Sequence, residues 1–111
     1  MIWTASNNGK KHPSRTGYRF KISAGDRDRT FMTAWRQITI ELPTQSGAVL
    51  VKVNVGKDSF WRDCRELISD AIGRWLLDQG FPPWLQGRQP KFDVELTEAG
   101  AFRVKGPIRV G

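Results

Sequence analysis

The sequence has a single cysteine and a single histidine, and it has no long apolar run. Cys64 cannot form an internal disulfide or a cysteine metal cluster by itself. No stretch approaches the roughly 18 apolar residues that a membrane-spanning helix needs. The first residues also lack the basic and apolar segments of a secretory signal. We therefore expect a cytoplasmic protein with no membrane span, no metal site and no cofactor.

Catalytic signatures are also missing. The chain contains no P-loop, zinc-finger, helix-turn-helix or basic-zipper spacing. His12 has no second titrating residue beside it, although general acid–base catalysis normally uses two. Asp93 and Glu95, with Lys105 nearby, partly match the Asp…Glu-x-Lys set of many nucleases, but Thr97 stands where that set has lysine. The sequence therefore predicts a non-catalytic protein.

The composition indicates one folded domain. The chain has 111 residues, 39% of them hydrophobic, including five tryptophans and six phenylalanines, which is enough for a packed core. Residues 1–16 are mostly polar and basic, with Gly9 and Pro13 among them. We interpret residues 1–16 as an arm or loop and residues 17–111 as a single α+β domain.

Alternating apolar side chains predict strands. Tyr18, Phe20 and Ile22 alternate with polar residues, which is typical of a half-buried strand. Ser23 or Asp26 is suited to cap a short helix over residues 27–35. Residues 36–42 and 48–55 alternate again around a turn cluster, which predicts a hairpin. Further strands are expected around residues 92–96 and 102–104.

One segment favours a long helix. Over residues 59–79 the apolar side chains recur at helical spacing, with Asp58 or Ser59 as the N-cap and Gly80 at the C-terminal end. We therefore expect an α+β fold in which an antiparallel sheet carries one long amphipathic helix on a face. The predicted order is β-α-β-β-α-β-β, and its first six elements match a ferredoxin-like arrangement. Cys64 falls on the apolar face of the predicted helix, where a thiol packs as a small hydrophobic group.

The charge is distributed unevenly. Residues 1–36 carry eight basic and two acidic side chains, whereas residues 37–111 carry ten basic and nine acidic ones. Six of the seven net positive charges therefore lie in the first third of the chain. Such asymmetry favours a polyanionic partner, most often nucleic acid.

The sequence therefore predicts a small nucleic-acid-binding domain, for DNA or RNA, that contacts phosphates through its N-terminal arm and first strand. The expected contacts are Lys10, Lys11, Arg15, Arg19 and Lys21, with Arg27 and Arg29 as secondary ones. The alternative interpretation of this charge is a solvated surface that keeps a small domain soluble.

Two other functions stay open. Phe81 and Trp84 lie in a proline-rich loop, residues 81–86, that predicts an interaction loop. A protein-interaction or adaptor domain would dock through this loop or a sheet edge on an acidic protein or a second copy, and pairing of residues 102–105 would give a homodimer. A small-molecule pocket between sheet and helix, lined by Trp35, Trp61 or Trp75, is the third hypothesis.

Overall fold

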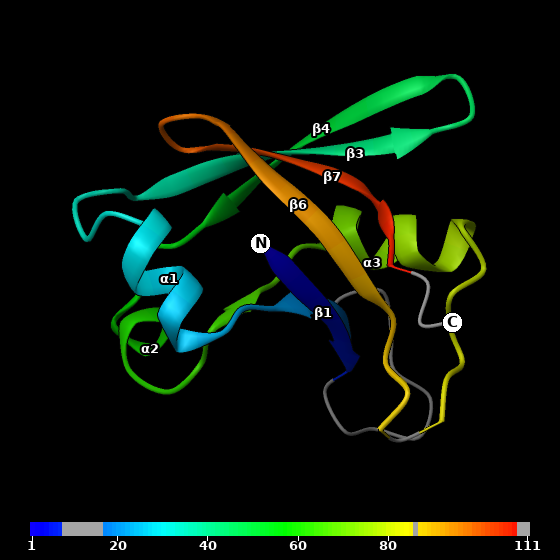
Figure 1. The fold of residues 1–111 in the computed structure, drawn as a ribbon, viewed down its shortest axis with the longest axis horizontal. Coiled ribbons are helices and arrows are strands. Elements are labelled where there is room, and N and C mark those ends of the chain that lie inside the picture. Colours follow the sequence, from blue (N-terminus) through cyan, green and yellow to red (C-terminus); the bar gives the residue numbers. More distant parts are fainter. Residues whose placement is uncertain (8–16, 86, 109–111) are drawn as a thin grey trace.

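A seven-stranded mixed sheet curls into a half-barrel, and short helices pack beside it (Figure 1). The computed structural model describes residues 1–7, 17–85 and 87–108. The strands are β1 (Ile2–Asn7), β2 (Tyr18–Lys21), β3 (Gln37–Thr44), β4 (Gly47–Asn54), β5 (Glu66–Leu67), β6 (Lys91–Glu98) and β7 (Ala101–Pro107). The helices are α1 (Ala24–Thr30), α2 (Asp58–Trp61) and α3 (Asp70–Asp78).

The strand order is β4-β3-β7-β6-β1-β2-β5. All neighbours are antiparallel except β3 and β7, which run parallel, with Ile40 opposite Phe102. The predicted antiparallel sheet in a ferredoxin-like order is therefore wrong. The physical reason is the long connection through α2, β5 and α3, which brings the chain back across the sheet. The strands β6 and β7 that follow it therefore lie between β1 and β3, with β7 parallel to β3.

The first strand is part of the sheet. Trp3 and Ala5 are buried, and β1 pairs with β2 on one side and β6 on the other. The amino group of Met1 donates a hydrogen bond to the Val94 carbonyl at 2.8 Å. The predicted arm, residues 1–16, thus includes the whole of β1, while the predicted contacts on residues 8–16 lie outside the described part of the chain.

The predicted hairpin is confirmed. β3 and β4 pair from Gln37 and Asn54 to Thr44 and Gly47, so the connecting turn has two residues. Gly47 has a φ of 137°, a backbone conformation that residues with a Cβ rarely adopt. The Ser23 cap is also confirmed, because its Oγ accepts the Asp26 N–H at 3.1 Å, although α1 starts and ends earlier than expected.

The single long helix over residues 59–79 is wrong. The segment contains α2, the short strand β5 and α3 in succession. Leu67 pairs with Phe20 of β2 and is fully buried there, so this position gains more from the sheet than from a helix. Ser69 then begins α3, with its Oγ accepting the Ala71 N–H at 3.2 Å. Cys64 consequently lies between α2 and β5, partly exposed.

The core fills the concave side of the sheet and is rich in aromatic rings. Trp3 lies between Phe20 and Phe102, with ring centroids 5.6 Å and 5.3 Å apart. Trp75 of α3 reaches the same cluster, 5.5 Å from Phe92. The core therefore joins β1, β2, β6, β7 and α3 into one unit.

Across the described residues, none of the helices has the length and apolarity to cross a bilayer.

Candidate nucleic-acid interface

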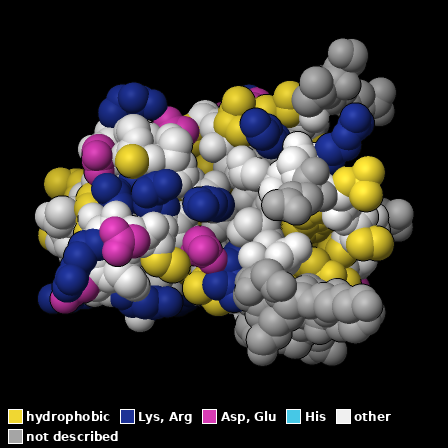
Figure 2. Space-filling view, turned by 90° about the horizontal axis from the view of Figure 1, so that it is seen from below, with side chains coloured by type: hydrophobic (Ala, Val, Ile, Leu, Met, Phe, Trp, Pro, Cys, Tyr) yellow, Lys and Arg dark blue, Asp and Glu magenta, His cyan; other side chains and the backbone are white. Residues whose placement is uncertain are grey.

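Basic side chains gather where α1 and α2 lie, and we call this region the basic end (Figure 2). Backbone contacts bring its segments together. The Ile22 N–H donates to the Arg65 carbonyl at 2.9 Å, and Arg65 Nε donates back to the Ile22 carbonyl at 3.1 Å. Val55 and Gly56 both donate to the Arg36 carbonyl, at 2.9 Å and 3.1 Å. The cations of the basic end are Lys21, Arg27, Arg29, Arg36, Lys57, Arg62 and Arg65.

The basic end has an excess of positive charge. Its segments, residues 21–36 and 56–65, contain seven basic and four acidic side chains. Three pairs reduce the excess locally: Arg27 with Asp28 at 3.1 Å, Arg29 with Asp26 at 2.7 Å and Arg62 with Asp58 at 3.5 Å. The pairs of Arg29 and Arg62 involve exposed guanidinium groups, and such pairs are weak and readily exchanged for other partners. The exposed cations of the basic end therefore remain able to bind an anion.

Arg27 has a different environment from the other cations. It is only 7% exposed, and its Nη1 donates to the Phe60 carbonyl at 2.9 Å. Its guanidinium also lies 5.3 Å from the centre of the Trp61 ring and 3.1 Å from an Asp28 carboxylate oxygen. These contacts join α1 to α2, so Arg27 positions the surface on which the exposed cations lie.

The structure separates the predicted contacts into two groups. Lys10, Lys11 and Arg15 belong to residues 8–16, outside the described residues. Among the described residues that flank that segment, Asn7 faces Tyr18 in the β1–β2 ladder.

The remaining predicted contacts differ in exposure. Arg19 is largely buried and forms an ion pair with Glu66 at 2.8 Å. Lys21 lies at the other end of β2 from Tyr18, about 10 Å away along the strand, and is exposed, like Arg29. Lys21 and Arg29 thus belong to the exposed part of the basic end, whereas Arg19 is held by β5.

Four cations of the basic end were missed by sequence reasoning: Arg36, Lys57, Arg62 and Arg65. Arg62 and Arg65 had been assigned to the predicted long helix, where acidic residues outnumber basic ones. The break after α2 separates them from Asp70 and Asp78 and places them beside β2 and α1. The Ser69 cap was the sequence signal that would have separated these two groups.

The outer face of the sheet carries paired charges. Arg103 of β7 bonds to Glu41 of β3 and, at 3.1 Å, to Glu95 of β6. Lys105 lies 3.7 Å from Asp93 and 4.0 Å from Glu95. The hydrogen bond with Glu41, then its charge, raises the pKa of Arg103 above its ordinary value. In the described part of the chain, no three potential metal ligands come together.

The interaction-loop residues fold back on the core. The Phe81 ring lies 5.0 Å from Phe92, edge to face, and the Trp84 ring lies 5.5 Å from Tyr18. Both aromatics are therefore partly buried, while Leu85 beside them is 73% exposed. In the described part of the loop, Pro83 and Leu85 are the exposed apolar residues.

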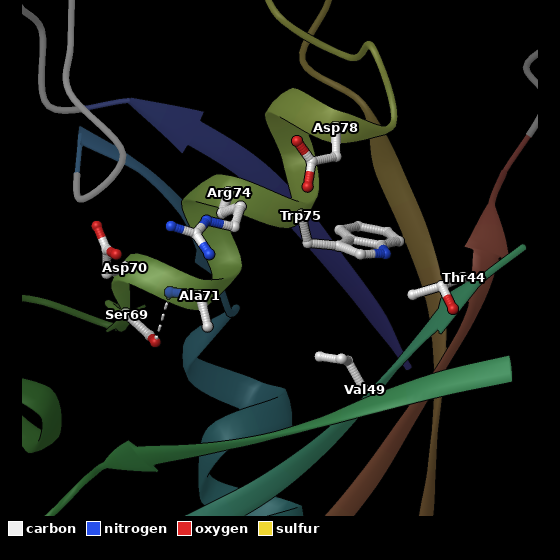
Figure 3. Close-up of a pocket in the computed structure, with 8 residues that line it drawn as sticks. All are labelled: Thr44, Val49, Ser69, Asp70, Ala71, Arg74, Trp75 and Asp78. Carbon is white, nitrogen blue, oxygen red and sulfur yellow. Dashed lines mark hydrogen bonds between the residues drawn. The ribbon is translucent and has the colours of Figure 1, made fainter. Parts of the chain in front are cut away.

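A groove of about 500 Å³ lies between α3 and the end of the β3–β4 hairpin that is next to its turn. Trp75 points from α3 toward the hairpin, between Thr44 and Val49 (Figure 3). Its Nε1 already donates to the Pro43 carbonyl at 2.7 Å. Of the three tryptophans expected to line a pocket, Trp75 lines this groove, whereas Trp35 packs on Phe31 and Trp61 on Phe60.

No family model matches the chain, and no curated protein sequence or solved structure matches it either. The function must therefore be argued from the charge, exposure and contacts of the residues themselves.

Proposed function

We propose that this protein binds nucleic acid, contacting phosphates through the basic end and through the basic segment 8–16. The observation that supports the proposal is the imbalance of seven basic against four acidic side chains at the basic end. On the outer face of the sheet, by contrast, Arg103 and Lys105 are paired with three carboxylates. Unbalanced exposed cations are the groups that phosphates attract.

The short helices at the basic end favour contacts with the phosphates of a nucleic acid over recognition of its bases. α1 has seven residues and α2 has four, whereas the elements that read the major groove are usually longer helices or strand pairs. Arginine and lysine on helix ends and turns contact phosphates well. The proposal is therefore binding that depends mainly on charge, with modest sequence preference. A cytoplasmic location is part of the proposal, since Cys64 would stay reduced there.

Fluorescence anisotropy tests this proposal directly. Labelled duplex DNA, single-stranded DNA and RNA are titrated with the full chain at about 50 and 200 mM salt. If about six phosphates are contacted, log K falls with log salt at a slope near −5 for duplex DNA. Absence of binding to all three at low salt would overturn the proposal and favour an acidic protein as the partner of the basic end.

Matched variants locate the contacts. The double variant Lys57→Gln with Arg62→Gln removes two exposed cations of the basic end. The slope of log K against log salt should become less steep by about 1.4 to 1.8. Lys52→Gln with Lys105→Gln removes the same charge from the sheet and serves as the control. Replacing Lys10, Lys11 and Arg15 with alanine tests segment 8–16 separately. If these first two double variants lost affinity equally, binding would depend on the net charge of the protein, and the basic end would not be the binding surface.

A further inference from the structure

The strand β4 is an unprotected edge. It ends the sheet order, so among the described strands it pairs with β3 alone. Val49 is 45% exposed and Leu50 is 71% exposed, on opposite faces of the strand. Lys52 is its single charged residue. Natural edge strands usually carry charges, prolines or bulges that prevent pairing, and β4 has neither proline nor a register shift in its ladder.

The backbone of β4 is oriented for pairing. Ala48 faces Pro43, which has no N–H to donate, so this is a pair without hydrogen bonds between the two residues. The Pro43 carbonyl points away from β4, where it accepts the Trp75 Nε1–H. Because the pattern repeats every second residue, Ala48, Leu50 and Lys52 direct their N–H and C=O groups toward the free edge.

We infer that β4 pairs with β4 of a second copy of this chain in an antiparallel arrangement centred on Leu50. This register places Leu50 opposite Leu50 of the second copy and Val49 opposite the copy's Val51. It also places Lys52 opposite Ala48 of the copy, so no like charges face each other. Three residues from each strand supply the hydrogen bonds, and the two sheets become continuous. Shifting the centre to Val51 would put each Leu50 against a lysine, and shifting it to Lys52 would oppose two lysines.

The arrangement in space also suits a second copy. The half of β4 next to the β3–β4 turn lies along the upper outline of the molecule in Figure 1, and none of the described elements is drawn above it there. This edge replaces the one expected from the sequence, residues 102–105, because those residues belong to β7, which is paired with β3 and β6. The inference concerns association alone and stands whether or not the protein binds nucleic acid.

Cysteine capture tests the register. In a Cys64→Ser background, Leu50→Cys places two thiols across the symmetry axis on residues about 5.5 Å apart between Cα atoms, within the range that a disulfide spans. Asn54→Cys is the matched control on the same strand, because its two copies would lie about 27 Å apart. Mild oxidation should give a covalent dimer from Leu50→Cys and none from Asn54→Cys. Equal crosslinking of both would overturn the Leu50 register.

Sedimentation of the unmodified chain, from micromolar to millimolar concentration, should show a monomer–dimer equilibrium. Leu50→Lys opposes two charges at the axis and should weaken the dimer roughly tenfold or more. Because Leu50 is exposed, the variant should fold normally, which circular dichroism checks. A chain that stays monomeric throughout would overturn the inference and leave β4 free for a strand of a different protein.

Discussion

The outer face of the sheet and the basic end carry similar kinds of side chain but arrange them differently. On the sheet, strand register places Arg103 between Glu41 and Glu95, so these three charges meet opposite ones. At the basic end the cations other than Lys21 lie on short helices and in turns, where no ladder fixes their neighbours. Only part of that charge is paired, and the paired guanidinium groups of Arg29 and Arg62 are exposed.

The difference shows how secondary structure decides where net charge can accumulate. Cross-strand neighbours are fixed at about 5 Å, so like charges on a sheet repel strongly and opposite charges are favoured. Turns impose no such spacing, and long side chains there extend into solvent. The surface available for an anionic partner is therefore the one built from turns and short helices, with Arg27 as its internal support.

Replacing Arg27 should have the largest effect. Arg27→Ala removes a buried guanidinium and leaves the Phe60 carbonyl without its donor. The free energy of unfolding should fall by about 2 to 4 kcal/mol, since the hydrogen bond, the ring contact and the packed side chain are all lost. Urea denaturation followed by tryptophan fluorescence measures this change.

Arg29→Ala is the control for Arg27→Ala, because Arg29 lies on the same helix but is exposed. Its effect on the free energy of unfolding should stay within about 0.5 kcal/mol, while binding to nucleic acid weakens. If the two variants were equally stable, Arg27 would not be the support that joins α1 to α2.

Replacing Arg103 should have a smaller effect. Arg103→Gln leaves Glu41 and Glu95 without their shared cation, so the melting temperature should fall, and the fall should shrink at high salt. Pairing raises the pKa of Arg103, so its contribution is present below its unfolded pKa and is lost as pH rises through the folded pKa. The difference from wild type should therefore stay constant between about pH 7 and about pH 10.

Lys52→Gln is the control for Arg103→Gln, because Lys52 also lies on a strand but forms no ion pair with another described residue. Its melting temperature should match that of the wild type in dilute protein. A fall as large as that of Arg103→Gln would mean that loss of positive charge alone, without loss of pairing, lowers stability.

The sequence predicted the parts of the fold in which local pattern and tertiary contacts agree. The β3–β4 hairpin is such a case, since alternation and burial place the same side chains in the core, although residues 43, 44 and 47 of the predicted turn cluster belong to the strands. The alternating residues around Phe20, Phe92 and Phe102 also become buried strands. The β1 strand was missed because Thr4, Ser6 and Asn7 are polar, and only the burial of Trp3 and Ala5 between two neighbours makes it a strand.

The long helix failed because spacing alone does not say what covers an apolar residue. Phe60, Leu67, Ile72 and Leu76 are all buried, so the pattern found core residues correctly. Leu67, however, is buried because its strand pairs with β2, and the local sequence around Leu67 does not show which strand it pairs with. The same error kept Arg62 and Arg65 out of the predicted interface, whereas charge asymmetry placed Lys21 and Arg29 among the predicted contacts.

The smallest expected effect comes from a carboxylate of the basic end. Asp63 is exposed in the turn after α2, next to Arg62. Asp63→Asn removes one repulsive charge from the proposed phosphate-binding surface, so affinity for nucleic acid should rise about two- to threefold at low salt and change little at high salt. Glu98→Gln makes the same chemical change at the end of β6, on the sheet, and should leave affinity unchanged. Anisotropy titrations of both variants compare the two regions with the protein's net charge held equal, so a gain confined to Asp63→Asn would locate the binding surface at the basic end, and equal gains would contradict it.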